Sequence, residues 1–113
     1  MMELHLGDVR LVSLLDGTFR LDGGAMFGIV PKALWEKLYA PDGKNRVGIA
    51  LRPLLVEIAG KRVLVDTGMG DRWGEKERTI YAIERSPTLL ESLAAAGVRP
   101  EQVDVVVLTH LNF

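Results

Sequence analysis

At Val103-Asp104-Val105-Val106-Val107-Leu108-Thr109-His110-Leu111-Asn112-Phe113 the sequence combines a strand signal with a candidate functional residue. The β-branched and aliphatic run is too short to span a membrane, and it has the composition of a buried central strand. His110 follows that strand directly, and ligands of open α/β sheets bind outside the carboxyl ends of the strands. The position favours a functional role for His110, although a histidine with a purely structural role at a strand end has the same sequence pattern.

The composition limits the classes of function that the chain can have. Its 113 residues form one domain or part of one, and a compact domain of this size would bury roughly two-thirds of the surface that the unfolded chain exposes. Charge is balanced, with 14 Lys and Arg against 15 Asp and Glu, so nucleic acid is not expected as a partner. The chain has no cysteine, and any metal would need nitrogen and oxygen ligands. No leader or membrane span is recognisable, so a cytoplasmic protein without a membrane partner is expected.

A first hairpin is expected near the N-terminus. The apolar run 9–15 and the alternating segment 18–21 flank Asp16-Gly17. Asp-Gly between two such runs is the strongest short-range hairpin signal, because a type I′ turn needs the positive φ that these residues tolerate. A short amphipathic helix is then expected over 31–39, where Pro31 suits a first helical position.

A second hairpin is expected in the middle of the chain. The strand-like segments 49–58 and 62–66 flank a turn at Ala59-Gly60-Lys61, and Pro53 assigns the first strand to a sheet edge or a bulge. The glycine-rich loop 67–71 follows the second strand, and its glycines would let the backbone approach a ligand or another loop closely.

One helix then leads into the terminal strand. The charged segment 71–85 is expected to be an exposed loop. The segment 86–97 predicts a helix, since Ser86 can cap its start and Gly97 suits the position just past its end. Antiparallel hairpins followed by a helix and one strand predict an α+β fold.

Asp66 is the second candidate site residue. It stands just past an apolar strand, as His110 does, and the two side chains can meet at one sheet edge if the strands are neighbours. The alternative is that Asp66 only caps the Thr67-Gly68 turn through its side chain. His5 is expected to be solvated. The sequence contains no dinucleotide fingerprint, P-loop, G-x-S-x-G or H-E-x-x-H motif.

With both strand ends in view, the chain resembles the metallo-β-lactamase superfamily, and within it the lactonase-like metallohydrolases. Three stretches carry the resemblance in the expected order: Leu21-Asp22-Gly23-Gly24-Ala25-Met26-Phe27-Gly28-Ile29-Val30-Pro31, Val63-Leu64-Val65-Asp66-Thr67-Gly68 and Val106-Val107-Leu108-Thr109-His110-Leu111-Asn112-Phe113. The family fold is an αββα sandwich formed by a longer chain. The resemblance implies that residues 1–113 are the N-terminal half of such a domain and end inside the family motif His-x-His-x-Asp-His.

The resemblance also implies a zinc site. His110 matches the first histidine of the motif, a metal ligand, and Asp66 matches the aspartate that supports the site without ligating metal. Asn112 stands where the second histidine belongs, and an amide oxygen is a poorer zinc ligand than imidazole. The complete family site holds two zinc ions, whereas the ligands present here are too few for a catalytic centre of about three protein ligands.

Two functions follow from the resemblance. In the first, the chain is part of a zinc-dependent hydrolase in which a metal-bound hydroxide attacks an ester, lactone, thioester or amide of a small-molecule substrate, and the isolated chain is inactive. In the second, it is a non-catalytic half-domain that acts as a homodimeric folding or assembly unit, because a half sandwich exposes an apolar sheet face that a second copy could cover. No residue identifies the substrate.

Overall fold

The computed structural model describes residues 2–111, and these residues form two compact units. Each unit is built from segments that are distant in the sequence. The first comprises the described residues 2–17, 50–72 and 85–111, and the second comprises residues 18–49 and 73–84. Both candidate site residues that the structure describes lie in the first unit.

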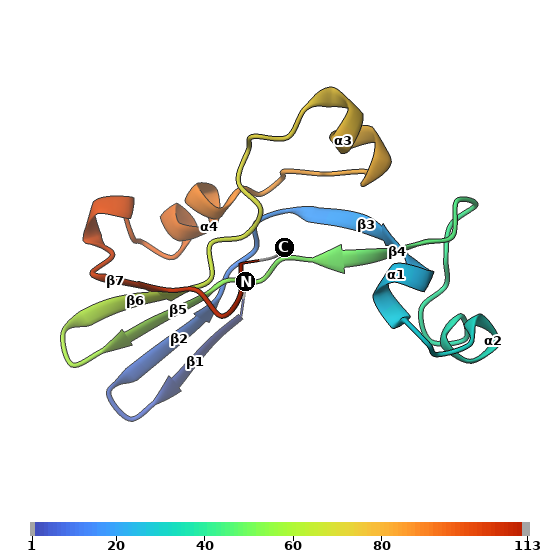
Figure 1. Cartoon of the computed structure of the whole chain (residues 1–113). Coiled ribbons are helices and arrows are strands. Elements are labelled where there is room, and N and C mark those ends of the chain that lie inside the picture. The colour runs from blue at the N-terminus through green and yellow to red at the C-terminus, as the bar shows by residue number, and fades with distance from the viewer. Residues whose placement is uncertain (1, 112–113) are drawn as a thin grey trace. The chain divides into compact units, whose positions relative to one another are not determined.

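The first unit is built on a five-stranded sheet (Figure 1). In sheet order, its strands are β1 (Met2–Leu6), β2 (Val9–Ser13), β5 (Leu54–Ile58), β6 (Lys61–Val65) and β7 (Val105–Val107). The pairs β1/β2, β2/β5 and β5/β6 are antiparallel, whereas β6 and β7 run parallel. The connection between β6 and β7 contains helix α4 (Leu89–Ala95) and the 3₁₀ turn η1 (Pro100–Gln102). Because β6 and β7 are parallel, their carboxyl ends lie at the same edge of the sheet.

Helix α4 packs on one face of this sheet. Val12, Leu55 and Leu64 are partners in register on neighbouring strands, so their side chains point to the same face. All three are buried, in one cluster with Leu93 and Ala96 from the helical segment. This apolar contact holds β5 and β6, and therefore the strand end before Asp66, in a fixed place.

The second unit contains a two-stranded sheet and three short helices. Its strands are β3 (Thr18–Asp22) and β4 (Arg46–Ala50), and its helices are α1 (Gly23–Phe27), α2 (Lys32–Trp35) and α3 (Glu75–Ile80). The buried hydrophobic side chains described in this unit are Phe19, Trp35 and Val47. The ring of Trp35 stacks on Phe27 with 4.9 Å between centroids, and it lies so close to Gly23 that a Cβ there would overlap it.

The hairpin predicted at Asp16-Gly17 is wrong. Strand β2 pairs with β1 through a turn at Gly7 (φ 60°), while β3 belongs to the other sheet. Beyond β2 the chain stays paired with the segment before β5: the amides of Leu14 and Asp16 donate to the carbonyls of Pro53 and Leu51, each at 2.9 Å, and the carbonyl of Gly17 (φ 76°) accepts from the amide of Leu51 at 3.3 Å. The Asp-Gly pair is therefore the continuation of a paired segment rather than a turn.

The hairpin at Ala59-Gly60 is confirmed. The two residues have φ of 51° and 73°, the positive values that a type I′ turn requires, and they connect β5 to β6. The expectation for Pro53 is wrong, because β5 lies between β2 and β6 and the buried proline precedes it. A proline immediately before a strand removes no hydrogen bond from the sheet.

The helices differ from the prediction in number, length and capping, and α1 and α3 were not predicted. Helix α3 occupies part of 71–85, which was expected to be a loop. Helix α4 is capped by Thr88 instead of Ser86, and Gly97 has the expected positive φ, 80°. The helix predicted over 31–39 is reduced to the four residues of α2. Within residues 2–111, no helix is long and apolar enough to cross a membrane.

The terminal strand does not have the predicted buried, central position. In the described sheet β7 is the last strand in order, and Val105, Val106 and Val107 are 46%, 51% and 43% exposed. Its β-branched composition correctly indicated a strand. It could not indicate which neighbours cover that strand.

Candidate functional site

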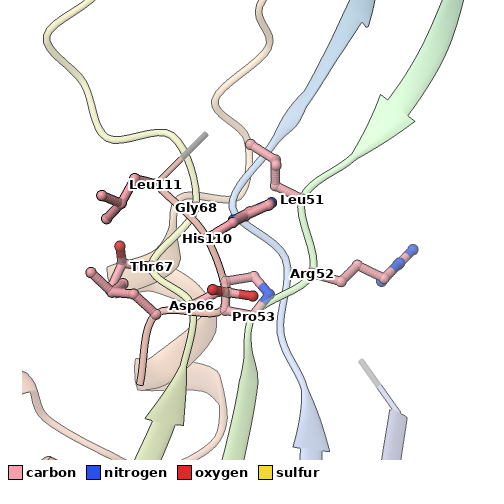
Figure 2. Close-up of a pocket in the computed structure, with 9 residues that line it drawn as sticks. Leu51, Arg52, Pro53, Asp66, Thr67, Gly68, His110 and Leu111 are labelled. Atoms are coloured by element: carbon pink, nitrogen blue, oxygen red, sulfur yellow. The ribbon is translucent and has the colours of Figure 1, made fainter. Parts of the chain in front are cut away.

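The ends of β6 and β7 bring the two predicted site residues to one place. Val65 and Val107 are partners in register, and the amide of Asp66, the next residue, donates to the carbonyl of Val107 at 2.7 Å. Asp66 and His110 both line a cavity of about 180 Å³ (Figure 2). The remaining lining residues are Leu51, Arg52, Pro53, Thr67, Gly68, Leu108 and Leu111. The two strands are therefore neighbours, as a shared site at these strand ends requires.

Asp66 is held by Thr109, the residue before His110. Oδ1 accepts a hydrogen bond from the Thr109 amide at 2.9 Å, and the Thr109 hydroxyl lies 2.9 Å from Oδ1 and 2.8 Å from Oδ2. The bonds from the amide and the hydroxyl hold the pKa of Asp66 below its ordinary value, against a smaller opposing effect of desolvation, and the nearby His110 adds an electrostatic contribution. The carboxylate thus joins the two strand ends. The alternative interpretation, in which Asp66 only caps the Thr67-Gly68 turn, did not predict this contact.

His110 is exposed and its ring faces the cavity (Figure 2). The preceding residue, Thr109, fixes the backbone next to His110, because its amide and hydroxyl are both bonded to Asp66. His5, the other histidine, is exposed on β1 and pairs with Glu3 at 3.0 Å, so it takes no part in this cavity.

The described residues do not by themselves fit a zinc centre. No group of three His, Cys, Asp or Glu side chains that could hold a metal ion occurs in the described part of the chain. Asn112, the predicted weak ligand, lies outside the described residues. His110 supplies one nitrogen donor and Asp66 is already bonded to Thr109. Since a catalytic zinc needs about three protein ligands, no chemical step through a metal can be assigned to these residues alone.

One residue of this region was missed by the sequence reasoning. Asp16 is completely buried, and its carboxylate accepts bonds from the amides of Met69 and Leu89, each at 2.7 Å, and pairs with Arg85 at 3.0 Å. The sequence signal was the uninterrupted apolar character of Leu14 and Leu15 before it, which is more typical of a buried segment than of a hairpin end. The stronger Asp-Gly turn pattern masked that signal.

A protein-family model matches the second half of the chain. The family model of the metallo-beta-lactamase superfamily matches residues 53–113, more than half of the chain and the segment that contains both strand ends of the cavity. No curated protein sequence gave a significant match.

Solved structures agree with the family match. A probable metal-dependent hydrolase from Staphylococcus aureus is 32% identical with a TM-score of 0.89, and the hydrolase AbOPH of the beta-lactamase superfamily is 32% identical with a TM-score of 0.72. The fold is also that of AidC, a dizinc quorum-quenching lactonase solved with a product, at 24% identity and a TM-score of 0.72.

The alignments cover nearly all of this chain but only part of each solved structure. They include 97%, 97% and 98% of this chain, and 40%, 35% and 36% of the respective solved chains. The predicted α+β fold, part of a metallo-β-lactamase-like sandwich, is confirmed. The matched family, the shared fold and the paired strand ends lead to one conclusion: the chain belongs to the metallo-beta-lactamase superfamily.

Proposed function

We propose that this chain is the N-terminal portion of a zinc-dependent hydrolase that cleaves an ester, lactone, thioester or amide bond in a small-molecule substrate. The observation that carries the proposal is the meeting of Asp66 and His110 at one cavity, on the ends of parallel neighbouring strands. Family membership supports hydrolysis as the reaction class. The 35–40% coverage of the similar structures supports the view that further residues complete the site.

The roles proposed for the two residues differ. His110 is exposed at the cavity and makes no hydrogen bond among residues 2–111, so its ring nitrogens are available to a metal. Asp66 is bonded to Thr109 and acts as the support of the site without ligating metal. Because residues 2–111 place a single imidazole at the cavity and contain no group of three metal-binding side chains, we expect the isolated chain to be inactive by itself.

The test begins with the coding sequence that follows Phe113. Codons for Asp-His at the next two positions support the proposal, and an immediate stop codon contradicts it. The complete reading frame is then expressed, stripped of metal and assayed for zinc content and for hydrolysis of a lactone and an aryl ester after zinc is restored. His110→Ala should remove activity and lower the zinc content, while the matched variant His5→Ala should leave both unchanged. Equal effects of the two substitutions would refute the role of His110.

A second candidate is a non-catalytic half-domain that forms a homodimer. The observation in its favour is the exposed apolar end of the sheet, where Val105, Val106, Val107 and Leu108 are 43–52% exposed. An open strand edge with apolar side chains favours association with another chain. Light scattering on the 113-residue chain separates the candidates when combined with metal analysis. A uniform dimer without zinc favours the assembly unit, and a monomer at all concentrations excludes it.

A further inference from the structure

We propose that Asp16 is the positioning residue of the cavity, because it fixes the loop that follows β6 and forms part of the cavity wall. The loop is residues 66–69, which begin with Asp66 and include the lining residues Thr67 and Gly68. The inference rests on the proposed function in one respect, since it takes this cavity as the place of reaction. The contacts that carry it all lie within the first unit.

The carboxylate of Asp16 joins three segments. Oδ2 accepts from the amide of Met69 in the loop, while Oδ1 accepts from the amide of Leu89 at the start of α4 and pairs with Arg85. The side chain is 1% exposed, so water cannot replace these donors. A buried carboxylate without its partners is strongly unfavourable, and the three donors are therefore held together with it.

The backbone of Asp16 reaches a second wall of the cavity. Its amide donates to the carbonyl of Leu51 at 2.9 Å, and the amide of Leu51 donates to the carbonyl of Gly17 at 3.3 Å. Leu51 lines the cavity from a different segment of the chain than the loop 66–69 does. One buried residue is thus bonded to two of the three segments that line the cavity, through its main chain to 51–53 and through its side chain to the loop 66–69.

Gly68 shows how closely the loop is packed on this carboxylate. Its φ is 75°, and a Cβ built on it would overlap the carboxylate of Asp16. The loop is therefore fixed at both ends: Asp66 is bonded to Thr109, and Met69 is bonded to Asp16. Thr67 and Gly68 lie between these two attachments, so a loss of the Asp16 contact should change the wall of the cavity and not only the stability of the fold.

The test is NMR on the 113-residue chain, with Asp16→Asn as the first variant. Met69 and Leu89 donate to different oxygens of Asp16, and asparagine replaces one of those oxygens with an NH₂ group that cannot accept, so in this geometry one of the two amides loses its acceptor. We expect the amide of one of them to exchange about tenfold faster or more. We also expect the Thr67, Gly68 and Thr109 amide resonances and the His110 ring resonances to shift.

Asp42→Asn is the matched control. Asp42 also accepts from two backbone amides, those of Lys44 and Arg46, and pairs with Arg46, but it lies in the second unit. This substitution should leave the resonances of the cavity unchanged. If it shifts them as Asp16→Asn does, the effect is a general loss of stability and the proposal is wrong.

A second pair of variants approaches the same contact from the loop. Gly68→Ala and Gly70→Ala impose a methyl group at similar positive φ, 75° and 70°, but only the first meets Asp16, since nothing lies within 4 Å of the second. Gly68→Ala alone should shift the Thr109 and His110 resonances and speed exchange at Leu89, the other amide on the carboxylate. This comparison remains decisive if Asp16→Asn does not fold.

Two further results would overturn the inference. One is a folded Asp16→Asn with faster exchange at Met69 or Leu89 but unchanged cavity resonances, which would make Asp16 a structural tie only. The other is an equal response to Gly68→Ala and Gly70→Ala. None of these measurements uses hydrolysis or zinc, so a failure of the proposed function leaves their outcome intact and the two failures are distinguishable.

Discussion

Substitution of Ser92 by alanine should destabilise the first unit through the backbone of a single residue, Leu15. Ser92 lies inside α4 and is 6% exposed. Its hydroxyl donates to the carbonyl of Leu15 at 2.6 Å and is 3.3 Å from the amide of the same residue, which donates to it. Leu14 and Asp16 on either side bond to residues 53 and 51, so the polar groups of Leu15 point the other way and depend on this hydroxyl.

The magnitude follows from the two bonds. Each hydrogen bond contributes about 1 kcal/mol net, and a buried group left without a partner adds to the loss. Leu15 is half-buried, so water can reach it in part, and we expect a decrease in the free energy of unfolding of about 2 kcal/mol. With an m-value of about 1–3 kcal/mol/M, the urea midpoint should fall by roughly 0.7–2 M.

The assay is urea unfolding followed by circular dichroism, together with amide exchange at Leu15. Ser13→Ala is the control, because Ser13 is a half-buried serine on β2 whose side chain has no hydrogen bond within the described residues, and its loss should stay within about 0.5 kcal/mol. A decrease of less than about 0.5 kcal/mol for Ser92→Ala, with Leu15 exchange unchanged, would show that water replaces the hydroxyl and that the reasoning is wrong.

Two further predictions concern the cavity and the second unit. Thr109→Val should raise the pKa of Asp66 toward its ordinary value of 3.8, but not all the way, since the amide bond with the larger effect remains; a carboxyl titration by NMR with no change in the pKa would contradict this. Gly23→Ala should destabilise the second unit by about 1–3 kcal/mol in urea unfolding, because its Cβ overlaps the buried ring of Trp35. Gly48→Ala, with open space around the added Cβ, is its control, and equal losses would refute the packing argument.

The sequence was most informative where a local pattern decides the structure. Ala59-Gly60 predicted a hairpin correctly, because the residues between two adjacent strands must themselves supply the turn geometry. The strand before His110 was also correct as a strand. The meeting of Asp66 and His110 at one sheet edge could be predicted, since both directly follow strands. The family resemblance also places both residues at one site.

What the sequence could not supply was set by contacts between distant segments. Asp16-Gly17 has the composition of a turn, but the carboxylate is bonded to Met69 and Leu89, more than 50 residues away in sequence. The bonds that it makes in the folded chain override the local preference. The exposure of β7 has a similar cause, because a run of valines predicts a strand and says nothing about what covers it.

The two aspartates act on the same loop with different physical chemistry. Asp16 is buried with a guanidinium and two amides, so its bonds are protected from water. Asp66 is partly exposed, and the donors that lower its pKa are mainly the neutral amide and hydroxyl of Thr109. Because its pKa is depressed, the Asp66 contact is fully present above the ordinary aspartate pKa and is lost only as the pH falls through the lower, folded value. Near neutral pH the Asp66 attachment therefore persists. With the Asp16 contact it forms a series of contacts that runs from Asp16 through the loop to Asp66 and Thr109, the residue before His110.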